Sequence, residues 1–217
     1  MAETVTIIDY GSGNLRSVQK ALERAAREAG LEMEVVISSD AETIARADRI
    51  VLPGVGAFRA CFHGLSALPG MLEALEDVVR RRGRPFLGVC VGMQLLASRG
   101  HEYGLSEGLG WIAGDVRPLA DLPGVEAEAL RVPHMGWNDV EFAEVGGFGG
   151  DRHEAYYFAH SYYFDAENAA DVIASATYGA RIATGLKKDN ILGFQFHPEK
   201  SQRAGIDLLA AFLGWRP

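Results

Sequence analysis

The sequence has few cysteines and no long apolar run, and each shortage excludes a class of protein. Among 217 residues there are two cysteines, Cys61 and Cys90, too few for the disulfide framework of a small secreted domain. No set of Cys and His residues has the spacing of zinc ligands. The longest nearly apolar run, residues 86–97, is much shorter than the roughly 20 residues of a membrane-spanning helix. These shortages favour a reducing compartment, and we expect a cytoplasmic protein.

Positive charge is also scarce, because 21 Lys and Arg residues stand against 29 Asp and Glu residues, for a net charge of −8. Binding to nucleic-acid backbones depends on clustered basic side chains, so we expect no nucleic-acid partner. The one dense basic run, Arg80-Arg81-Arg82 with Arg84, is typical of the solvated end of a helix. The first residues lack the basic and apolar regions of a signal peptide, so we expect neither export nor membrane attachment.

The first hundred residues contain a regular alternation of short apolar runs and amphipathic segments. In residues 15–29 the apolar side chains recur every three or four positions, which is the spacing of one helix face. Continuous apolar strands that alternate with helices predict a parallel sheet covered on both faces. The expected strands are 4–9, 33–37, 49–52 and 85–89, and the expected helices are 15–29, 40–47, 69–82 and 92–98.

After Gly100 glycine, proline and aromatic residues become more frequent, and the apolar runs become shorter. This texture predicts antiparallel strands, a hairpin loop at 188–190 and a last helix capped by Ser201. We expect an α/β fold: a single open, mostly parallel sheet flanked by helices, with an antiparallel β-rich C-terminal half, in one domain over residues 1–217. The strands expected in this half are 111–117, 129–132, 140–142, 155–164, 172–178, 181–186 and 191–196.

The sharpest motif is Gly88-Val89-Cys90-Val91-Gly92, at the point where an apolar strand ends and a helix is expected to begin. Flanking glycines let the chain bend sharply and hold a nucleophilic side chain clear of the backbone. The helix N-terminus would also favour the thiolate, which is the attacking form. A lone cysteine is more often an inert core residue, and this is the role that we expect for Cys61.

A base for such a nucleophile is offered by Phe194-Gln195-Phe196-His197-Pro198-Glu199. His197 follows an expected strand, so it can lie at the same sheet edge as Cys90. A carboxylate at Glu199 could bind one ring nitrogen and leave the other to take the thiol proton. The alternative is a loop histidine with an incidental surface glutamate.

Two glycine-rich turns follow other expected strands. The segment Leu52-Pro53-Gly54-Val55-Gly56 could direct backbone N–H groups toward a developing oxyanion, although by itself it is an ordinary turn. The segment Gly11-Ser12-Gly13-Asn14-Leu15-Arg16 begins like a dinucleotide-binding fingerprint. However, Arg16 replaces the third glycine, and no acidic residue follows at the required distance. We therefore expect no nicotinamide cofactor.

Together these motifs resemble the class I glutamine amidotransferases, which use a Cys-His-Glu triad. The resemblance extends from Ile8 to Ser201 and rests first on Leu87–Gln94 and His197–Glu199. Further segments resemble one branch of that family, the glutaminase subunits that supply ammonia to a cyclase subunit in histidine biosynthesis. These segments are Asp9–Ser17, Leu52–Gly56, Pro133–Asn138 and His197–Ser201. The stretch 144–151 matches no motif, and Gln202 stands where many relatives have a second serine.

The resemblance implies a glutaminase that needs no cofactor and no metal. Cys90 would attack the side-chain amide of glutamine, His197 would carry protons, and Glu199 would orient His197. A γ-glutamyl thioester would form, ammonia would leave, and water would release glutamate.

The resemblance also implies roles for residues around the triad. Substrate would be bound by Gly88, Gln94, Ser161 and Tyr162. A peptide flip near Val55 and Gly56 would supply the oxyanion donor, so we expect low activity without the partner. The partner is a (β/α)₈ barrel cyclase subunit in a heterodimer, and it would be faced by Asn14, Trp137, Tyr157 and Lys200.

Two rival functions stay open on the sequence. One is the glutaminase component of anthranilate or aminodeoxychorismate synthase, although the segments around Asn14 and Trp137 argue against it. The other is a catalytically silent regulatory subunit, against which the intact Cys90, His197 and Glu199 count.

Overall fold

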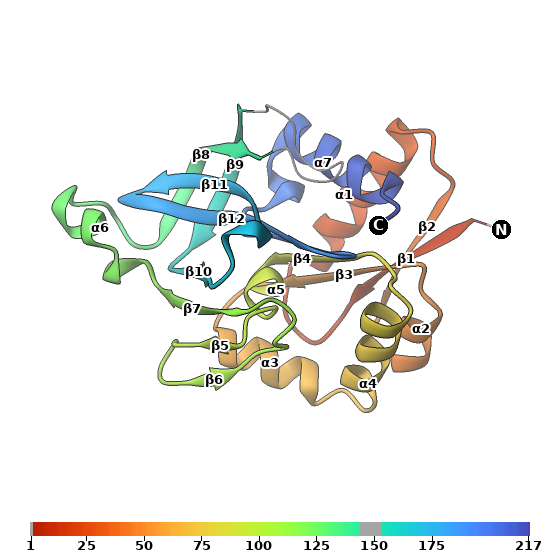
Figure 1. The fold of residues 1–217 in the computed structure, drawn as a ribbon. Helices are drawn as coiled ribbons and strands as arrows, with labels where there is room; N and C mark the ends of the chain where they lie inside the picture. Colours follow the sequence, from red (N-terminus) through yellow and green to blue (C-terminus); the bar gives the residue numbers. More distant parts are fainter. Residues whose placement is uncertain (1, 144–152) are drawn as a thin grey trace.

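The computed structural model describes residues 2–143 and 153–217, and an open sheet runs through this part of the chain (Figure 1). One half of the sheet is parallel, because its neighbouring strands all run in the same direction. In spatial order its strands are β2 (Met33–Ser38), β1 (Glu3–Ile8), β3 (Arg49–Gly54), β4 (Phe86–Cys90) and β13 (Ile191–Phe194).

The other half of the sheet is mostly antiparallel and continues from β13. It follows the order β12 (Ala180–Lys188), β10 (Tyr162–Ala166), β7 (Gly114–Pro118), β5 (Arg99–Gly100) and β6 (Ser106–Glu107). A second arm branches from β12 through β11 (Val172–Tyr178), β8 (His134–Phe142) and β9 (His153–His160). The sheet prediction is thereby confirmed: a single non-closed sheet with an antiparallel C-terminal half.

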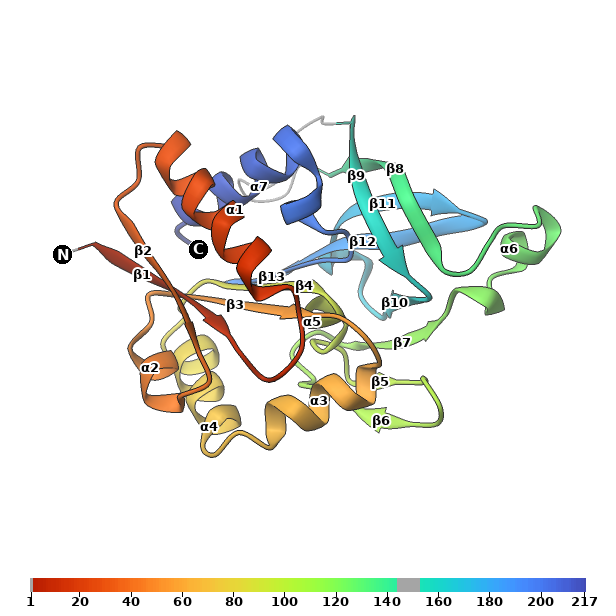
Figure 2. The ribbon, with the colours of Figure 1, turned by 180° about the vertical axis from the view of Figure 1, so that it is seen from behind.

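Helices cover both faces of the parallel half (Figures 1 and 2). On one face α1 (Leu15–Glu28) packs beside α7 (Gln202–Gly214). On the other lie α2 (Ala41–Arg46), α3 (Phe58–Ser66), α4 (Met71–Leu75) and its π-helical continuation η1 (Glu76–Arg81). The short elements are α5 (Val91–Gln94), α6 (Pro123–Ala127) and the 3₁₀ turns η2 (Leu119–Asp121), η3 (Ala169–Asp171) and η4 (Pro198–Lys200).

The burial pattern explains why these segments form these layers. In α1 the buried side chains all fall on one face, as their spacing predicts. Every residue of β3 and β4 is buried, because helices lie above and below these central strands. In the described ranges, no helix is both long enough and apolar enough to cross a membrane.

Several element boundaries differ from the expectations. Residues 129–132 are not a strand, because α6 ends immediately before them and Ala129 adopts a φ of +50°. The strand expected at 155–164 is two strands, β9 and β10, separated at Ser161. The helix expected at 92–98 is the short α5. The hairpin loop is where it was expected, since Lys188 pairs with Ile191.

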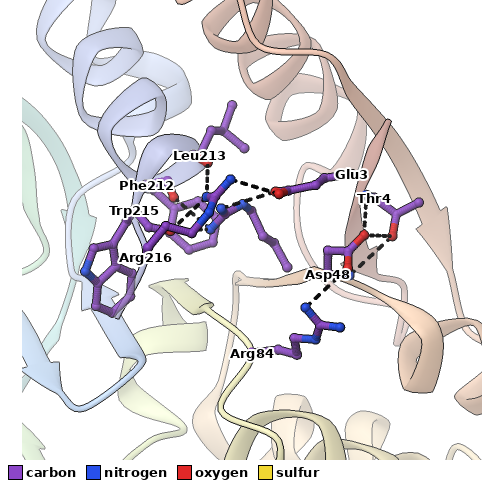
Figure 3. A network of polar contacts seen from close by, with 9 residues as sticks. Glu3, Thr4, Asp48, Arg84, Phe212, Leu213, Trp215 and Arg216 are labelled. Atoms are coloured by element: carbon purple, nitrogen blue, oxygen red, sulfur yellow. Dashed lines mark hydrogen bonds and ion pairs between the residues drawn. The ribbon is translucent and has the colours of Figure 1, made fainter. Parts of the chain in front are cut away.

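A buried arginine joins the two ends of the chain. Arg49 of β3 donates to the carbonyl oxygens of Phe212 (3.3 Å) and Trp215 (2.9 Å). The Nη2 atom of Arg49 lies 3.3 Å from the carboxylate of Glu3. The same carboxylate also binds Arg216 at 2.8 Å (Figure 3). The contacts fix the C-terminal end of α7 to β1 and β3, away from the carboxyl ends of the strands.

The basic run lies at the end of η1, as the sequence predicts. Arg80 and Arg81 form its last turn. Arg82 forms an ion pair with Asp77 (2.9 Å), and Arg84 forms one with Asp48 (3.4 Å; Figure 3). This run is therefore part of the ordinary charged surface.

Candidate active site

Cys90 lies at a sharp bend between β4 and α5, where its φ is +54°. A positive φ is strained for a residue with a side chain and needs support from its surroundings. The two flanking glycines supply that support by close packing. A Cβ atom at Gly88 would lie 2.5 Å from the Gly92 carbonyl oxygen, and one at Gly92 would lie 1.8 Å from the Leu52 carbonyl oxygen. The bend therefore depends on the absence of side chains at both positions.

His197 lies next to Cys90, because it closely follows β13, which pairs in parallel with β4. The His197 Nδ1 atom is 2.9 Å from Glu199 Oε1, and the two side chains are only 4% and 2% exposed. The Oε2 atom of Glu199 is buried and has no hydrogen-bond partner among the described residues. With Nδ1 bound to the carboxylate, Nε2 of His197 is the ring nitrogen available to the thiol.

The electrostatics of this group favour the charged form of His197. Burial opposes protonation of His197, but hydrogen bonds and charges from Cys90 and Glu199 outweigh burial and raise the pKa of His197 to about 9. The imidazolium is therefore the favoured form at neutral pH, and it stabilises a neighbouring thiolate.

A cavity of about 440 Å³ opens beside Cys90 and His197. It is lined by residues from distant parts of the chain, including the turn after β3, α5, the bend between β9 and β10, and the start of β8. Most of the residues that the sequence assigned to substrate or oxyanion line this cavity: Val55, Gly56, Gln94, Ser161 and Tyr162. Gly88 does not line it and instead packs under the bend.

The side-chain amide of Gln94 is fixed by two acceptors. Its Nε2 atom donates to the Tyr162 carbonyl oxygen (3.1 Å) and to Gln195 Oε1 (2.9 Å). Gln195 in turn donates from Nε2 to the Cys90 sulfur at 3.7 Å. No motif in the sequence indicates a role for Gln195, although it alternates with Phe194 and Phe196 and so lies on the same side of the chain as His197.

Two buried histidines, not assigned from the sequence, extend this chain. His160 Nδ1 lies 2.8 Å from the Tyr162 carbonyl oxygen, and His160 Nε2 lies 2.9 Å from His134 Nδ1. Burial lowers the pKa of His134 to about 4 and that of His160 to about 3. Both rings are therefore neutral at physiological pH. No periodicity or spacing in the sequence indicates that β8 and β9 bring them together.

The turn after β3 is held by a hydroxyl group. Ser12 Oγ donates to the Val55 carbonyl oxygen (2.6 Å) and accepts from the Val55 N–H (3.1 Å). Cys61, expected to be an isolated core residue, also donates from its sulfur to the Val55 carbonyl oxygen at 3.4 Å. In this conformation the Val55 N–H is engaged by Ser12 and does not face an oxyanion.

Three of the four residues assigned to a partner surface lie together. The rings of Trp137 and Tyr157 are 6.2 Å apart, and Lys200 Nζ lies 5.5 Å from the centre of the Tyr157 ring. Trp137 is half exposed. The fourth residue, Asn14, is exposed at the start of α1, a helix that packs against the η4 turn holding Lys200. Within the described part of the chain, no three His, Cys, Asp or Glu side chains are grouped as metal ligands.

Comparisons with known proteins identify a family and several relatives. A family model, glutamine amidotransferase class-I, matches residues 6–213. The imidazole glycerol phosphate synthase subunit HisH of Brucella suis is 52% identical, with 98% of this chain and 99% of that protein covered. The subunit of the same name from Rhodospirillum rubrum is 50% identical over the same shares.

Solved structures share the fold at low sequence identity. A crystal structure of a glutamine amidotransferase has a TM-score of 0.69 at 19% identity and covers 95% of this chain and 98% of its own. A glutamine amidotransferase from Thermotoga maritima has a TM-score of 0.61 at 17% identity, with 92% and 77% covered.

Proposed function

The chain belongs to the class I glutamine amidotransferase family, and we propose that it is the glutaminase subunit of an imidazole glycerol phosphate synthase. The observation that carries the catalytic part is the grouping of Cys90, His197 and Glu199 at adjacent strand ends, beside one cavity. The choice of synthase rests on relatives that are about half identical over nearly the whole chain. Such relatives favour this synthase over the anthranilate and aminodeoxychorismate enzymes.

The reaction begins with attack of the Cys90 thiolate on the side-chain amide carbon of glutamine. As the tetrahedral intermediate collapses, the His197 imidazolium gives its proton to the departing nitrogen, and ammonia leaves. A γ-glutamyl thioester stays on Cys90. Neutral His197 then takes a proton from water, the resulting hydroxide attacks the thioester carbon, and glutamate leaves as the sulfur is regenerated. Glu199 holds Nδ1 of His197 throughout and stabilises its charged form.

The walls of the cavity position the substrate. Both amide hydrogens of Gln94 are used within the protein, so its amide oxygen is the atom that can accept from a bound glutamine. Ser161 and Tyr162 line the same cavity and complete the glutamine site. The backbone at Gly88 acts from below, by shaping the bend that presents Cys90.

The partner is a (β/α)₈ barrel cyclase subunit, which receives the ammonia and binds over Trp137, Tyr157, Lys200 and Asn14. In the heterodimer the partner also controls the oxyanion donor. Because the Val55 N–H is bound to Ser12, the turn at Val55 and Gly56 must rearrange before it can stabilise an oxyanion. The isolated chain therefore has low activity. Free thiols at both cysteines and a biosynthetic role support a cytoplasmic location for the enzyme.

The proposal is tested by assaying glutamate release and cyclisation in the purified complex with its cyclase partner. We expect Cys90→Ala to lower glutamine-dependent turnover at least about 1,000-fold, since the nucleophile is lost. Cyclisation supplied with ammonium salt serves as the control and should be unchanged. Glutamate release that persists in Cys90→Ala contradicts the mechanism, and activation by a chorismate-using partner instead would assign the chain to a rival synthase.

A further inference from the structure

Gln195 is a fully buried polar side chain that lies between Cys90 and Gln94. Its relative exposure is 0%, and both ends of its amide are used. The oxygen accepts from Gln94 Nε2 at 2.9 Å, and the nitrogen donates to Cys90 Sγ at 3.7 Å. A buried amide of this kind is tolerated only when its partners are in place. Its partners here are the expected nucleophile and an expected substrate-binding residue.

The segment that directly follows β13 places Gln195 there by alternation. Phe194 and Phe196 point to the opposite side, where their rings stack 5.2 Å apart. Gln195 and His197 therefore share the side that faces Cys90. β13 and β4 are hydrogen-bonded neighbours, and Phe194 pairs with Val89. The next residues along the two segments, Gln195 and Cys90, therefore also lie beside each other. Gln195 thus contacts Cys90 from the segment after β13, which also carries His197.

The direction of each hydrogen bond around Gln195 is fixed by its neighbours. The Tyr162 carbonyl oxygen can only accept, so both His160 Nδ1 and Gln94 Nε2 must donate to it. Gln94 then has one hydrogen left, which it gives to Gln195 Oε1. Gln195 must consequently turn its nitrogen, the donor end, toward the sulfur. This orientation suits a thiolate, which is an acceptor without a proton of its own.

We propose that Gln195 takes part in the glutaminase reaction in two ways, by donating to the Cys90 thiolate and by holding Gln94 in the orientation that receives glutamine. The first way stabilises the attacking form of the sulfur. The second acts through another residue, so it is a positioning role. The proposal rests on the proposed function, because it takes Cys90 as the nucleophile and glutamine as the substrate.

Two substitutions separate the two roles. Gln195→Glu keeps the shape and keeps an acceptor for Gln94, but it replaces the donor beside the sulfur by a carboxylate. Gln195→Leu removes both the donor and the acceptor. The titratable groups around Cys90 include His197, Glu199, Tyr10 and Cys61. The cavity that Cys90 lines adds Glu102, Tyr103, His160, Tyr162 and Lys200. All of these groups are the same in all three proteins.

The first measurement is the rate at which iodoacetamide alkylates Cys90 in the full chain, followed against pH by peptide mass spectrometry. Loss of a hydrogen bond to a charged group should move the half-maximal rate upward by about one pH unit in Gln195→Leu, and further in Gln195→Glu. Cys61, read in the same digest, is the internal control and should keep its profile.

The second measurement is glutamine hydrolysis by the complex with its cyclase partner. We expect kcat at pH 7 to fall about tenfold in both variants, because both lose the thiolate donor. KM should rise about tenfold in Gln195→Leu and stay near the wild-type value in Gln195→Glu, because only the latter still holds Gln94.

Alkylation profiles that match the wild type in both variants would overturn the donor role, and unchanged KM in Gln195→Leu would overturn the positioning role. If Gln195→Leu does not fold, the positioning role is decided by Gln195→Met, which also offers Gln94 no amide oxygen. A wild-type complex that releases no glutamate refutes the proposed function instead, and the alkylation profiles are independent of that result.

Discussion

The two turns that meet at the cavity are built in opposite ways. The bend at Cys90 is fixed by packing, since neither Gly88 nor Gly92 has room for a methyl group. The turn at Val55 is open instead: Val55 is 45% exposed, and a Cβ atom at Gly56 would meet nothing within 4 Å. Its orientation depends on two hydrogen bonds with the Ser12 hydroxyl and a weaker one from the Cys61 thiol. Hydrogen bonds of this type contribute about 1 kcal/mol each, so a partner can rearrange this turn while the nucleophile stays in place.

The largest effect is expected from adding a methyl group to each turn. Gly92→Ala should lower the free energy of unfolding by about 3 kcal/mol, because the new Cβ would overlap the Leu52 carbonyl oxygen. Gly56→Ala should cost about 1 kcal/mol, which is the strain of its φ of +96° in open space. Urea unfolding of the two variants measures the difference. Equal losses would mean that the two turns are equally constrained.

A smaller effect is expected when the hydroxyl that holds the open turn is removed. Ser12→Ala should raise glutamine hydrolysis by the isolated chain about tenfold, because two hydrogen bonds to the Val55 peptide no longer oppose its rearrangement. Ser12→Thr keeps the hydroxyl and is the matched control. Glutamate release without partner is the measurement, with Ser12→Ala combined with Cys90→Ala as the blank. A basal rate that stays level or falls would show that Ser12 does not restrain the turn.

The effect that is smallest at neutral pH, and that grows only on acidification, concerns the cavity wall built by the neutral histidines. An unfolded histidine binds a proton near pH 6.5, whereas the pKa values of His134 and His160 are lowered to about 4 and 3 in the fold. The unfolded chain therefore binds more protons between these values, and stability falls as the pH falls below 6.5, by up to about 1.4 kcal/mol per pH unit for each ring. The raised pKa of His197 acts oppositely, since its contribution is present below pH 6.5 and is lost as the pH rises through about 9.

His134→Asn tests this wall, because its Nδ2 can replace the donor that His134 Nδ1 presents to His160. The variant loses ring stacking with Phe158 and Tyr178 and should be less stable at every pH. Its stability should nevertheless depend less steeply on pH between 4 and 6.5, because one titrating group is gone. Thermal unfolding across that range gives the slope, and a slope as steep as that of the wild type would exclude a role for His134.

The parallel half of the sheet could be predicted from the sequence, because a strand that is buried on both faces is a continuous apolar run. Residues 86–90, for example, are apolar without interruption and form β4. It predicted the bend at Cys90 for a similar reason, since glycines at fixed positions mark a backbone that has no room for side chains. The expected strand at 129–132 was wrong because its short apolar pattern also fits the end of a helix, and the closure of α6 by a bond from Leu130 to Val125 decided the outcome.

Other contacts in the site are not indicated by any local sequence pattern. The contact between Ser12 and Val55 joins turns 43 residues apart, and the bond between Gln195 and Cys90 spans 105 residues. The hydroxyl of Ser201 also has partners that its position in the sequence does not indicate. A serine before a helix predicts a cap, but this hydroxyl donates to the His197 carbonyl oxygen and accepts from the Tyr157 N–H. The hydrogen-bond partners of a polar side chain therefore depend on contacts that form only when the chain is folded.

We infer that Cys90 is held in a fixed position and that its reactivity is controlled by the open turn at Val55. The most direct test is covalent capture with a diazoketone analogue of glutamine, with the rate of labelling measured for the chain alone and in complex with the cyclase subunit. We expect one label per chain, located on Cys90 and absent from Cys61, and at least about tenfold faster labelling in the complex. Labelling that avoids Cys90, or that proceeds equally fast with and without the partner, would contradict it.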